Sequence, residues 1–305
     1  MNRKEFLKKS AVATILIGAN SFPVSAFAKK EDTFTITILH TNDQHSRIEP
    51  FPMDGSKYQG LGGFSKRKTI VDKIRTEEKN VFLFDSGDIF QGTPYFNKYL
   101  GEVEIKLMNT LGYDAATIGN HDFDGGIENL STRIGEAKFP FVNCNYNFKK
   151  TILDKKILPY TIIEKNNVKV GVIGVGIELE GLVSKNLYDK IQYQNPLQIV
   201  NDTALFLKTK EHCHLVVCLS HLGYKYDNEK ISDEVLAAQS AHVDLILGGH
   251  THTFFEKPKE YTNKIGEKVI VNQVGWAGIN LGRIDLLIQN KKKHHISKNN
   301  NIKIK

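Results

Sequence analysis

Three scarcities narrow the classes of protein to which this sequence can belong. It has only three cysteines in 305 residues, which excludes a disulfide framework. A membrane-spanning helix needs about 20 apolar residues, and the apolar run from Ala11 to about Ala19 is too short. A net excess of positive charge is missing away from the ends of the chain. The formal net charge of +7 comes from the basic start and from six lysines in residues 290–305, so the slightly acidic body predicts no nucleic-acid-binding face.

Residues 1–28 have the pattern of an export signal. A basic start precedes the short apolar run, and Ala26-Phe27-Ala28 has the small-x-small form of a cleavage site. Arg3-Lys4 resembles a twin-arginine pair whose second arginine is replaced by lysine, so the twin-arginine and the general secretory (Sec) routes are both open. We therefore expect an exported protein of the periplasm or cell envelope, with no transmembrane span after signal removal. An amphipathic first helix of the mature fold is the alternative.

Residues 29–290 are predicted to form one domain of the α/β class, because strands and helices alternate along them. Strands are expected over 33–39, 81–84, 114–118, 139–142, 158–164, 168–175, 215–219, 245–247, 269–274 and 279–288, and helices over 62–76, 102–111, 127–137, 196–208 and 231–241. Asn166-Asn167 predicts a hairpin turn, which adds antiparallel pairing. Residues 291–305 are lysine-rich with little to bury, so we expect a disordered tail.

Five of the apolar runs end in residues that can bind a metal ion or move a proton. These residues are Asp43, His45, Asp88, Asn120, His121, His221, His250 and His252. Functional groups in open α/β sheets gather beyond the carboxyl ends of the strands, so we expect these residues to converge. Carboxylate, imidazole and amide ligands without a thiolate suit divalent manganese, zinc or iron. A single zinc ion needs about four ligands, so the surplus predicts two ions that share one carboxylate.

Taken in order, these clusters resemble the motifs of the calcineurin-type metallophosphoesterases. The motifs are Asp43-x-His45, Gly87-Asp88-x-x-Gln91-Gly92, Gly119-Asn120-His121-Asp122, Ser220-His221 and Gly248-Gly249-His250-Thr251-His252. Three longer strings narrow the resemblance to the catalytic (N-terminal) domain of the 5′-nucleotidases and UDP-sugar hydrolases. These strings are Leu39-His40-Thr41-Asn42-Asp43, Gly119 to Asp124, and Gly282-Arg283-Ile284-Asp285-Leu286. The resemblance covers residues 35–288 and implies a four-layer sandwich of two mixed sheets flanked by helices. Full-length relatives carry a C-terminal substrate-binding domain after the last string, which this sequence lacks.

The resemblance also assigns roles to individual residues. It implies that one metal ion is held by Asp43, His45, Asp88 and His252, and the other by Asp88, Asn120, His221 and His250. Asp88 would bridge the two ions. His121 and Asp124 would form a catalytic dyad that does not bind metal, and Asn120 and His121 would contact the substrate. Some relatives have glutamine in place of His252, which makes that ligand variable.

The chemistry of the residues agrees with these roles. Two cations lower the pKa of a shared water, hold a phosphate oxygen and neutralise charge while the resulting hydroxide attacks in line. His121, oriented by Asp124, would supply a proton or positive charge to the leaving alkoxide. The alternative for Asp124 is a helix N-cap. Three neighbours are expected to support the ligands or the loops that carry them, namely His40, Asn42 and Asp122.

The sequence therefore predicts an exported, dinuclear metal-dependent phosphoesterase of the 5′-nucleotidase type, which hydrolyses phosphate mono- or diesters of nucleotides. The catalytic half of a split nucleotidase, served by a separate substrate-binding-domain protein, is one alternative. A non-catalytic metal-binding subunit is another, although no ligand and no dyad histidine is missing from the sequence. A thiosulfate-ester hydrolase and a cyclic-nucleotide phosphodiesterase on the same scaffold also remain open.

Overall fold

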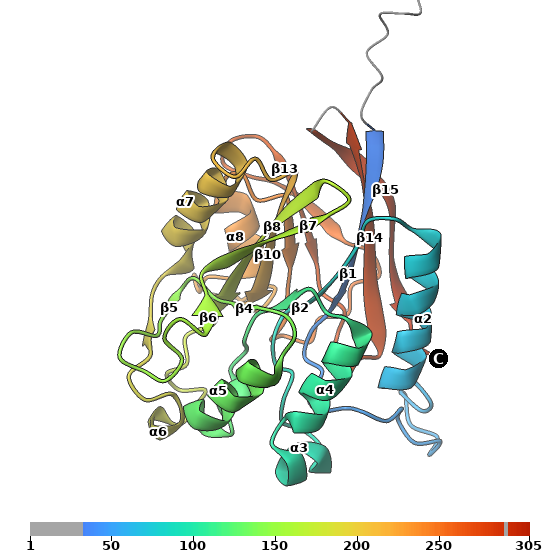
Figure 1. Cartoon of the computed structure of the whole chain (residues 1–305), viewed down its shortest axis with the longest axis vertical. Helices are drawn as coiled ribbons and strands as arrows, with labels where there is room; N and C mark the ends of the chain where they lie inside the picture. The colour runs from blue at the N-terminus through green and yellow to red at the C-terminus, as the bar shows by residue number, and fades with distance from the viewer. Residues whose placement is uncertain (1–32, 290–291) are drawn as a thin grey trace, which may run out of the picture.

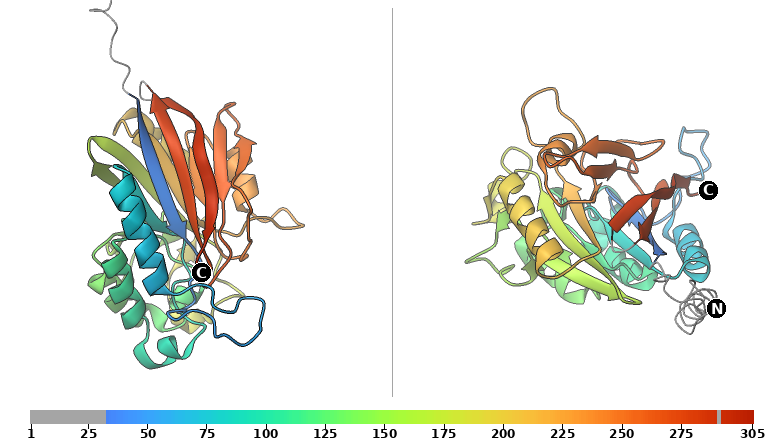
Figure 2. Two further views of the ribbon diagram at one scale, coloured as in Figure 1. Left: turned by 90° about the vertical axis from the view of Figure 1, so that its right-hand side faces the viewer. Right: turned by 90° about the horizontal axis from the view of Figure 1, so that it is seen from above.

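Two β-sheets pack face to face, and α-helices cover both outer faces, in the computed structural model of the chain, which describes residues 33–289 and 292–305 (Figure 1). In the right-hand view of Figure 2, the cyan helix α2 (Phe64–Glu77) and the gold helix α7 (Pro196–Thr209) lie on opposite sides of the molecule. The predicted α/β class and the four-layer arrangement are confirmed.

The first sheet has the strand order β15-β14-β1-β2-β3-β4-β6. Its strands are β1 (Thr33–Thr41), β2 (Val81–Asp85), β3 (Ala115–Ala116), β4 (Phe141–Val142), β6 (Ile157–Leu158), β14 (Asn280–Gln289) and β15 (Lys292–Lys303). β1 pairs in parallel with β2 and antiparallel with β14. Successive side chains point to opposite faces, so Leu39 and Leu83 pack under the helices while Ile38 and Phe82 pack against the second sheet. Burial on both faces explains why Val81 to Phe84 of β2 is apolar at every position.

The second sheet has the strand order β12-β13-β11-β10-β8-β7. Its strands are β7 (Tyr160–Lys165), β8 (Val168–Gly176), β10 (Leu215–His221), β11 (Leu245–Leu247), β12 (Lys259–Thr262) and β13 (Lys268–Asn272), and a small third sheet joins β5 (Tyr146–Asn147) to β9 (Gln192–Tyr193). The predicted hairpin is the pair β7 and β8. Asn166 and Asn167 have φ values of 50° and 65°, as a tight two-residue hairpin turn requires.

Each outer face of the sandwich is covered by its own set of helices. The first sheet is covered by α2, α4 (Glu102–Leu111) and α5 (Gly126–Glu136), and the second by α7 and α8 (Asp233–Gln239). All five predicted helices are present, with ends within two residues of the expected ones. Two short helices were not predicted, α3 (Pro94–Tyr99) and α6 (Lys185–Tyr188), because one or two turns give too little periodicity to recognise.

The predicted disorder of residues 291–305 is wrong. Lys292–Lys303 forms β15, which pairs antiparallel with β14 and so extends the first sheet. Two isoleucines at this end of the chain explain the order, because Ile304 is fully buried and Ile302 packs against the same core. The Ile304 backbone also donates to the Ile279 carbonyl and accepts from Gly62.

The predicted export signal, residues 1–28, lies outside the described residues. Among the residues that are described, no helix is both long enough and apolar enough to cross a membrane.

Candidate active site

The loops that follow the central strands of both sheets meet at one edge of the sandwich. β1 and β2 are followed by Asp43, His45 and Asp88, and β10 and β11 lead to His221, His250 and His252. The strands are parallel within each pair, so their carboxyl ends share one edge. The side chains gather in two groups whose ligand atoms lie within 4.8 Å of one another: a first group of Asp43, His45 and His252, and a second group of Asp88, His221 and His250.

The first group is compact. Nε2 of His45 and Nε2 of His252 are 3.0 Å apart. Asp43 Oδ1 lies 3.3 Å from His252 Nε2 and 4.0 Å from His45 Nε2. These three atoms come from loops of different sheets, so their meeting depends on how the two sheets pack.

Asp88 links the two groups. Its Oδ2 atom lies 3.1 Å from His221 Nε2 in the second group and 3.9 Å from His45 Nε2 in the first. Asn120 joins the second group, since its Oδ1 atom is 2.9 Å from His250 Nδ1. Every side chain that the sequence predicted as a metal ligand therefore lies in or against this site.

The hydrogen bonding of His221 fits a metal ligand. Its Nδ1 atom lies 2.7 Å from the Ser86 carbonyl oxygen, which can only accept, so Nδ1 carries the proton. The buried Nε2 atom has no hydrogen-bond partner, although Asp88 Oδ2 faces it. Burial lowers the pKa of His221, but the carboxylates of Asp88 and Asp43 outweigh burial and raise it to about 10. The two carboxylates thus favour positive charge beside this atom, and a divalent cation would supply it.

The backbone is strained at most of the predicted ligands. Positive φ values occur at Asp43 (49°), His45 (49°), Asp88 (55°), His250 (70°) and His252 (51°). Left-handed backbone costs a non-glycine residue about 1–3 kcal/mol and persists only where its surroundings over-determine it. Backbone hydrogen bonds supply that constraint, since the N–H groups of Asp43 and His45 donate to the carbonyls of Gly87 and Asp88 at 2.9 and 3.0 Å.

Asp122 anchors the loop that carries Asp88. Its fully buried carboxylate accepts the backbone N–H groups of Asp88, Ile89, Phe90 and Gly119 at distances of 2.8–3.1 Å. Asp122 therefore ties the loop after β2 to the loop after β3, which is the supporting role that its position suggested.

Glycine is needed at position 119 because the backbone there lies close to Asp88 and His221, and not because the chain turns there. Its φ is not positive, so the backbone would accept other residues. A Cβ atom there, however, would overlap Asp88 Oδ1 and lie 2.6 Å from His221 Nε2. The glycine thus allows the loop to pass directly beneath the second group.

His121 and Asp124 form a hydrogen-bonded pair at the mouth of the site. His121 Nδ1 lies 2.8 Å from Asp124 Oδ2, and the two side chains are 38% and 26% exposed. This hydrogen bond raises the pKa of His121 above its ordinary value of 6.5. The backbone N–H of His121 donates to Asp88 Oδ1 at 2.8 Å, which holds the pair beside both groups. Gly125, not Asp124, is the N-cap of α5, so the alternative role of Asp124 is not supported.

The neighbours of Asp43 behave differently from one another. Asn42 Nδ2 donates to Asp43 Oδ2 at 2.6 Å and also contacts the Gly275 carbonyl, so it orients Asp43 as expected. The expectation that His40 orients Asp43 is not supported. His40 Nε2 instead contacts Asn272 Nδ2 at 2.7 Å, and burial lowers its pKa to about 3.

Sequence reasoning missed two residues that shape the site. Trp276, the single tryptophan of the chain, stacks on the His252 ring with 5.8 Å between ring centroids and 8° between planes. Gln273 donates through Nε2 to the Gly249 carbonyl at 2.6 Å and so fixes the turn before His250. Both follow β13, in a segment that has no histidine or carboxylate to mark it.

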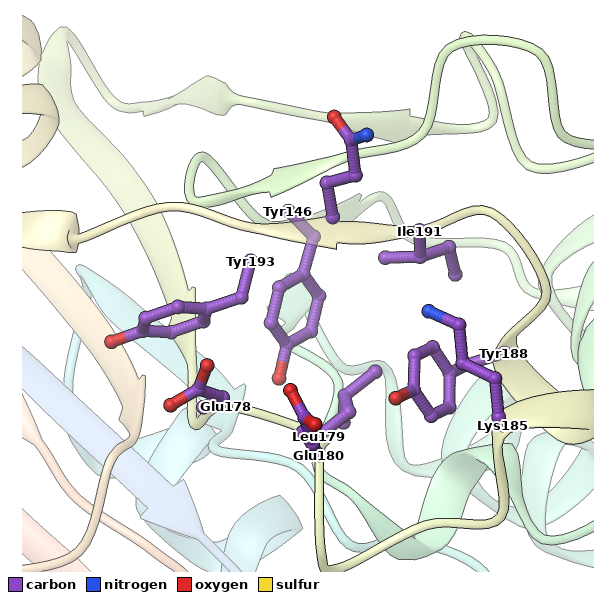
Figure 3. Close-up of a pocket in the computed structure, with 9 residues that line it drawn as sticks. Tyr146, Glu178, Leu179, Glu180, Lys185, Tyr188, Ile191 and Tyr193 are labelled. Atoms are coloured by element: carbon purple, nitrogen blue, oxygen red, sulfur yellow. The ribbon is translucent and has the colours of Figure 1, made fainter.

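A separate cavity of about 230 Å³ lies beyond the end of β8 (Figure 3). The rings of Tyr146, Tyr188 and Tyr193 line it, together with the carboxylates of Glu178 and Glu180. None of the predicted ligands is among its lining residues.

Comparison with known proteins agrees with this geometry. Residues 36–254 match the family model of the calcineurin-like phosphoesterases. The chain is 34% identical over 247 residues to snake venom 5′-nucleotidase of Gloydius brevicauda, a match that covers 79% of this chain and 40% of that protein. It is 33% identical over 254 residues to human 5′-nucleotidase, covering 80% of this chain and 42% of the human protein.

Solved structures give the same result. The 5′-nucleotidase precursor from Thermus thermophilus superposes with a TM-score of 0.81 at 28% identity, over 89% of this chain and 55% of that one. Haemophilus influenzae NAD nucleotidase superposes with a TM-score of 0.75 at 25% identity, over 88% of this chain and 50% of that one. The chain thus spans about half, or less, of the length of these relatives. It belongs to the calcineurin-like phosphoesterase family, and it is a metallophosphoesterase similar to the 5′-nucleotidases.

Proposed function

We propose that the chain is an exported, dinuclear metal-dependent phosphoesterase that hydrolyses phosphate mono- or diesters of nucleotides by in-line displacement. The observation that carries the proposal is the shared position of Asp88 between the first and second groups, with the His121–Asp124 pair beside it. The names of the relatives, which include 5′-nucleotidases and an NAD nucleotidase, support a nucleotide substrate.

Two ions would be held by the residues of the site. Asp43, His45, Asp88 and His252 would hold one ion, and Asp88, Asn120, His221 and His250 the other. When bound, divalent manganese, zinc or iron would polarise the phosphate and make a water acidic enough to attack near neutral pH. The absence of any thiolate from the two groups favours these borderline or hard ions.

His121 would act on the leaving group. Its ring is partly exposed at the mouth of the site, and Asp124 raises its pKa, so the protonated ring is available near neutral pH. Asp124 holds Nδ1, which leaves the Nε2 proton of the imidazolium free to pass to the departing alkoxide. Asn120 and His121 are adjacent in the chain and would both contact the phosphate.

The proposal has two forms, which differ in what supplies the substrate selectivity. In the first, the chain hydrolyses nucleotides by itself. In the second, it is the catalytic half of a split nucleotidase, and a separate substrate-binding-domain protein supplies the selectivity. The matched relatives are about twice as long as the region they share with this chain, which favours testing the second form.

A substrate panel separates the two forms. The purified chain is assayed against AMP, UDP-glucose and bis(4-nitrophenyl) phosphate, with and without added manganese. Turnover of AMP supports a self-sufficient nucleotidase, whereas turnover of the simple diester alone supports the split form. Inertness towards every compound with every metal would contradict both and favour a non-catalytic subunit.

Export is proposed from the basic, apolar and small-x-small pattern of residues 1–28. Expression of the full chain in a Gram-negative host, followed by mass spectrometry of the protein from the periplasmic fraction, tests it. Export predicts a mature amino terminus after Ala28, and retention of the intact chain in the cytoplasm would contradict it.

A further inference from the structure

A cluster of aromatic rings lies beside the first group and takes no part in the reaction proposed above. We call Phe51, Tyr58, Phe254 and Trp276 the aromatic shelf. They come from three loops far apart in the chain, which follow β1, β11 and β13. The shelf therefore exists only in the folded protein, at the same edge of the sandwich as the predicted metal ligands.

The shelf begins at a predicted ligand and runs away from it. Trp276 stacks on His252 with 5.8 Å between centroids. Tyr58 meets Trp276 edge-on at 6.2 Å and lies nearly parallel to Phe254, with 6.2 Å between centroids and 18° between planes. Phe51 also meets Trp276 edge-on, at 5.7 Å. A phosphate at the two groups would thus lie beside the end of the shelf that Trp276 forms on His252.

The rings are open to solvent rather than packed into a core. Phe254 is 39% exposed and the other three are half-buried. Phe254 is nevertheless held in place, because its ring lies against Gly275 so closely that a Cβ atom there would overlap it. Exposed, positioned aromatic faces are what a flat ligand needs for stacking.

Charge distinguishes the shelf from the tyrosine-lined cavity. Two cationic side chains accompany the shelf, with Arg47 Cζ 4.4 Å from the Phe51 centroid and Lys57 Nζ 5.1 Å from that of Tyr58. The cavity instead carries the exposed carboxylates of Glu178 and Glu180 (Figure 3). A phosphoester is anionic, so electrostatics favours the shelf and disfavours the cavity.

We propose that the aromatic shelf is a subsite of this chain for the flat heteroaromatic group of its substrate, a nucleobase. The proposal rests on the proposed function, and it gives the chain some nucleotide selectivity without a second domain. The base would stack at Tyr58 and Phe254 while the phosphate lies at the two groups.

The test compares two phosphomonoesters that differ only in the base. The measured quantity is the ratio of kcat/KM for AMP to kcat/KM for ribose 5-phosphate, with manganese present. Phe254→Ala and Tyr58→Ala are each expected to lower this ratio roughly tenfold, as loss of one stacking ring does. Tyr193→Ala, which removes a partly exposed aromatic ring from the cavity of Figure 3, is the matched control and leaves the ratio unchanged.

A second readout does not depend on turnover. Trp276 is the single tryptophan, so its fluorescence reports on the shelf alone. Adenosine, which has no ester to hydrolyse, is expected to quench it in the wild type and to do so more weakly in Phe254→Ala, while ribose has no effect.

The outcomes separate the two proposals. The nucleobase subsite is overturned if the AMP to ribose 5-phosphate ratio is unchanged in both Phe254→Ala and Tyr58→Ala, or if it falls in Tyr193→Ala instead. Absence of turnover of both AMP and ribose 5-phosphate by the wild type counts against the self-sufficient form of the proposed function. Adenosine quenching then decides the shelf by itself, since quenching supports it and no quenching overturns it.

Discussion

Replacing Asp122 with asparagine should destabilise the protein severely, although the two side chains have the same shape. The Asp122 carboxylate accepts four backbone N–H groups, two at each oxygen. Asparagine keeps one oxygen, which can accept two of them, and turns an amide NH₂ group towards the other two. Each buried N–H left without an acceptor costs about 1–3 kcal/mol. The free energy of unfolding should therefore fall by about 2–6 kcal/mol.

Urea denaturation of the metal-free protein, followed by circular dichroism, measures this loss without a contribution from bound ions. Asp124→Asn is the matched control, since it lies two residues away, is 26% exposed and accepts no backbone N–H. It should change stability by less than about 1 kcal/mol. A loss below about 1 kcal/mol in Asp122→Asn, or equal losses in both variants, would refute the anchoring role of Asp122.

Three further predictions concern the dyad and the close packing around Asp88. His121→Ala should lower turnover by a factor of about 10²–10⁴ while elemental analysis finds the metal content of the wild type; loss of metal would contradict a role confined to the leaving group. Because the hydrogen bond from Asp124 raises the pKa of His121 above 6.5, the protonated form persists to higher pH, and kcat/KM for alkyl phosphates should fall as pH rises through that raised pKa. In Asp124→Asn the fall should move to lower pH, and an unmoved profile would count against the pair. Gly119→Ala should lower bound metal, because its Cβ would overlap Asp88 Oδ1, whereas Gly135→Ala on α5 meets nothing within 4 Å and should bind metal as the wild type does.

The layers and the order of the ligands could be predicted because their causes are local. Val81 to Phe84 is apolar at every position because β2 is covered on both faces. Asp88 follows the carboxyl end of this strand, and parallel strands present those ends at one edge of the sheet, so its place in the site could be predicted. The hairpin at Asn166-Asn167 likewise depends on two residues that tolerate left-handed backbone.

Other features depend on contacts between distant segments and left no local signal. The lysine-rich sequence of β15 predicted disorder, yet this segment forms a strand because it pairs with β14 and because Ile304 beyond its end is buried. His250 and His252 adopt left-handed backbone, and the backbone N–H of His250 donates to the carboxylate of Asp43, which lies 207 positions away in the chain. Trp276 and His252 are 24 positions apart and meet only because β11 and β13 are neighbours in the second sheet.

The central claim is that two cations share Asp88. The most direct measurement is the metal content of the purified protein by elemental analysis, for the wild type and for Asp88→Asn. We expect two ions per wild-type chain and weakened binding of both in the variant, because each group loses the same carboxylate. A single ion in the wild type, or two ions retained in Asp88→Asn, would contradict the claim.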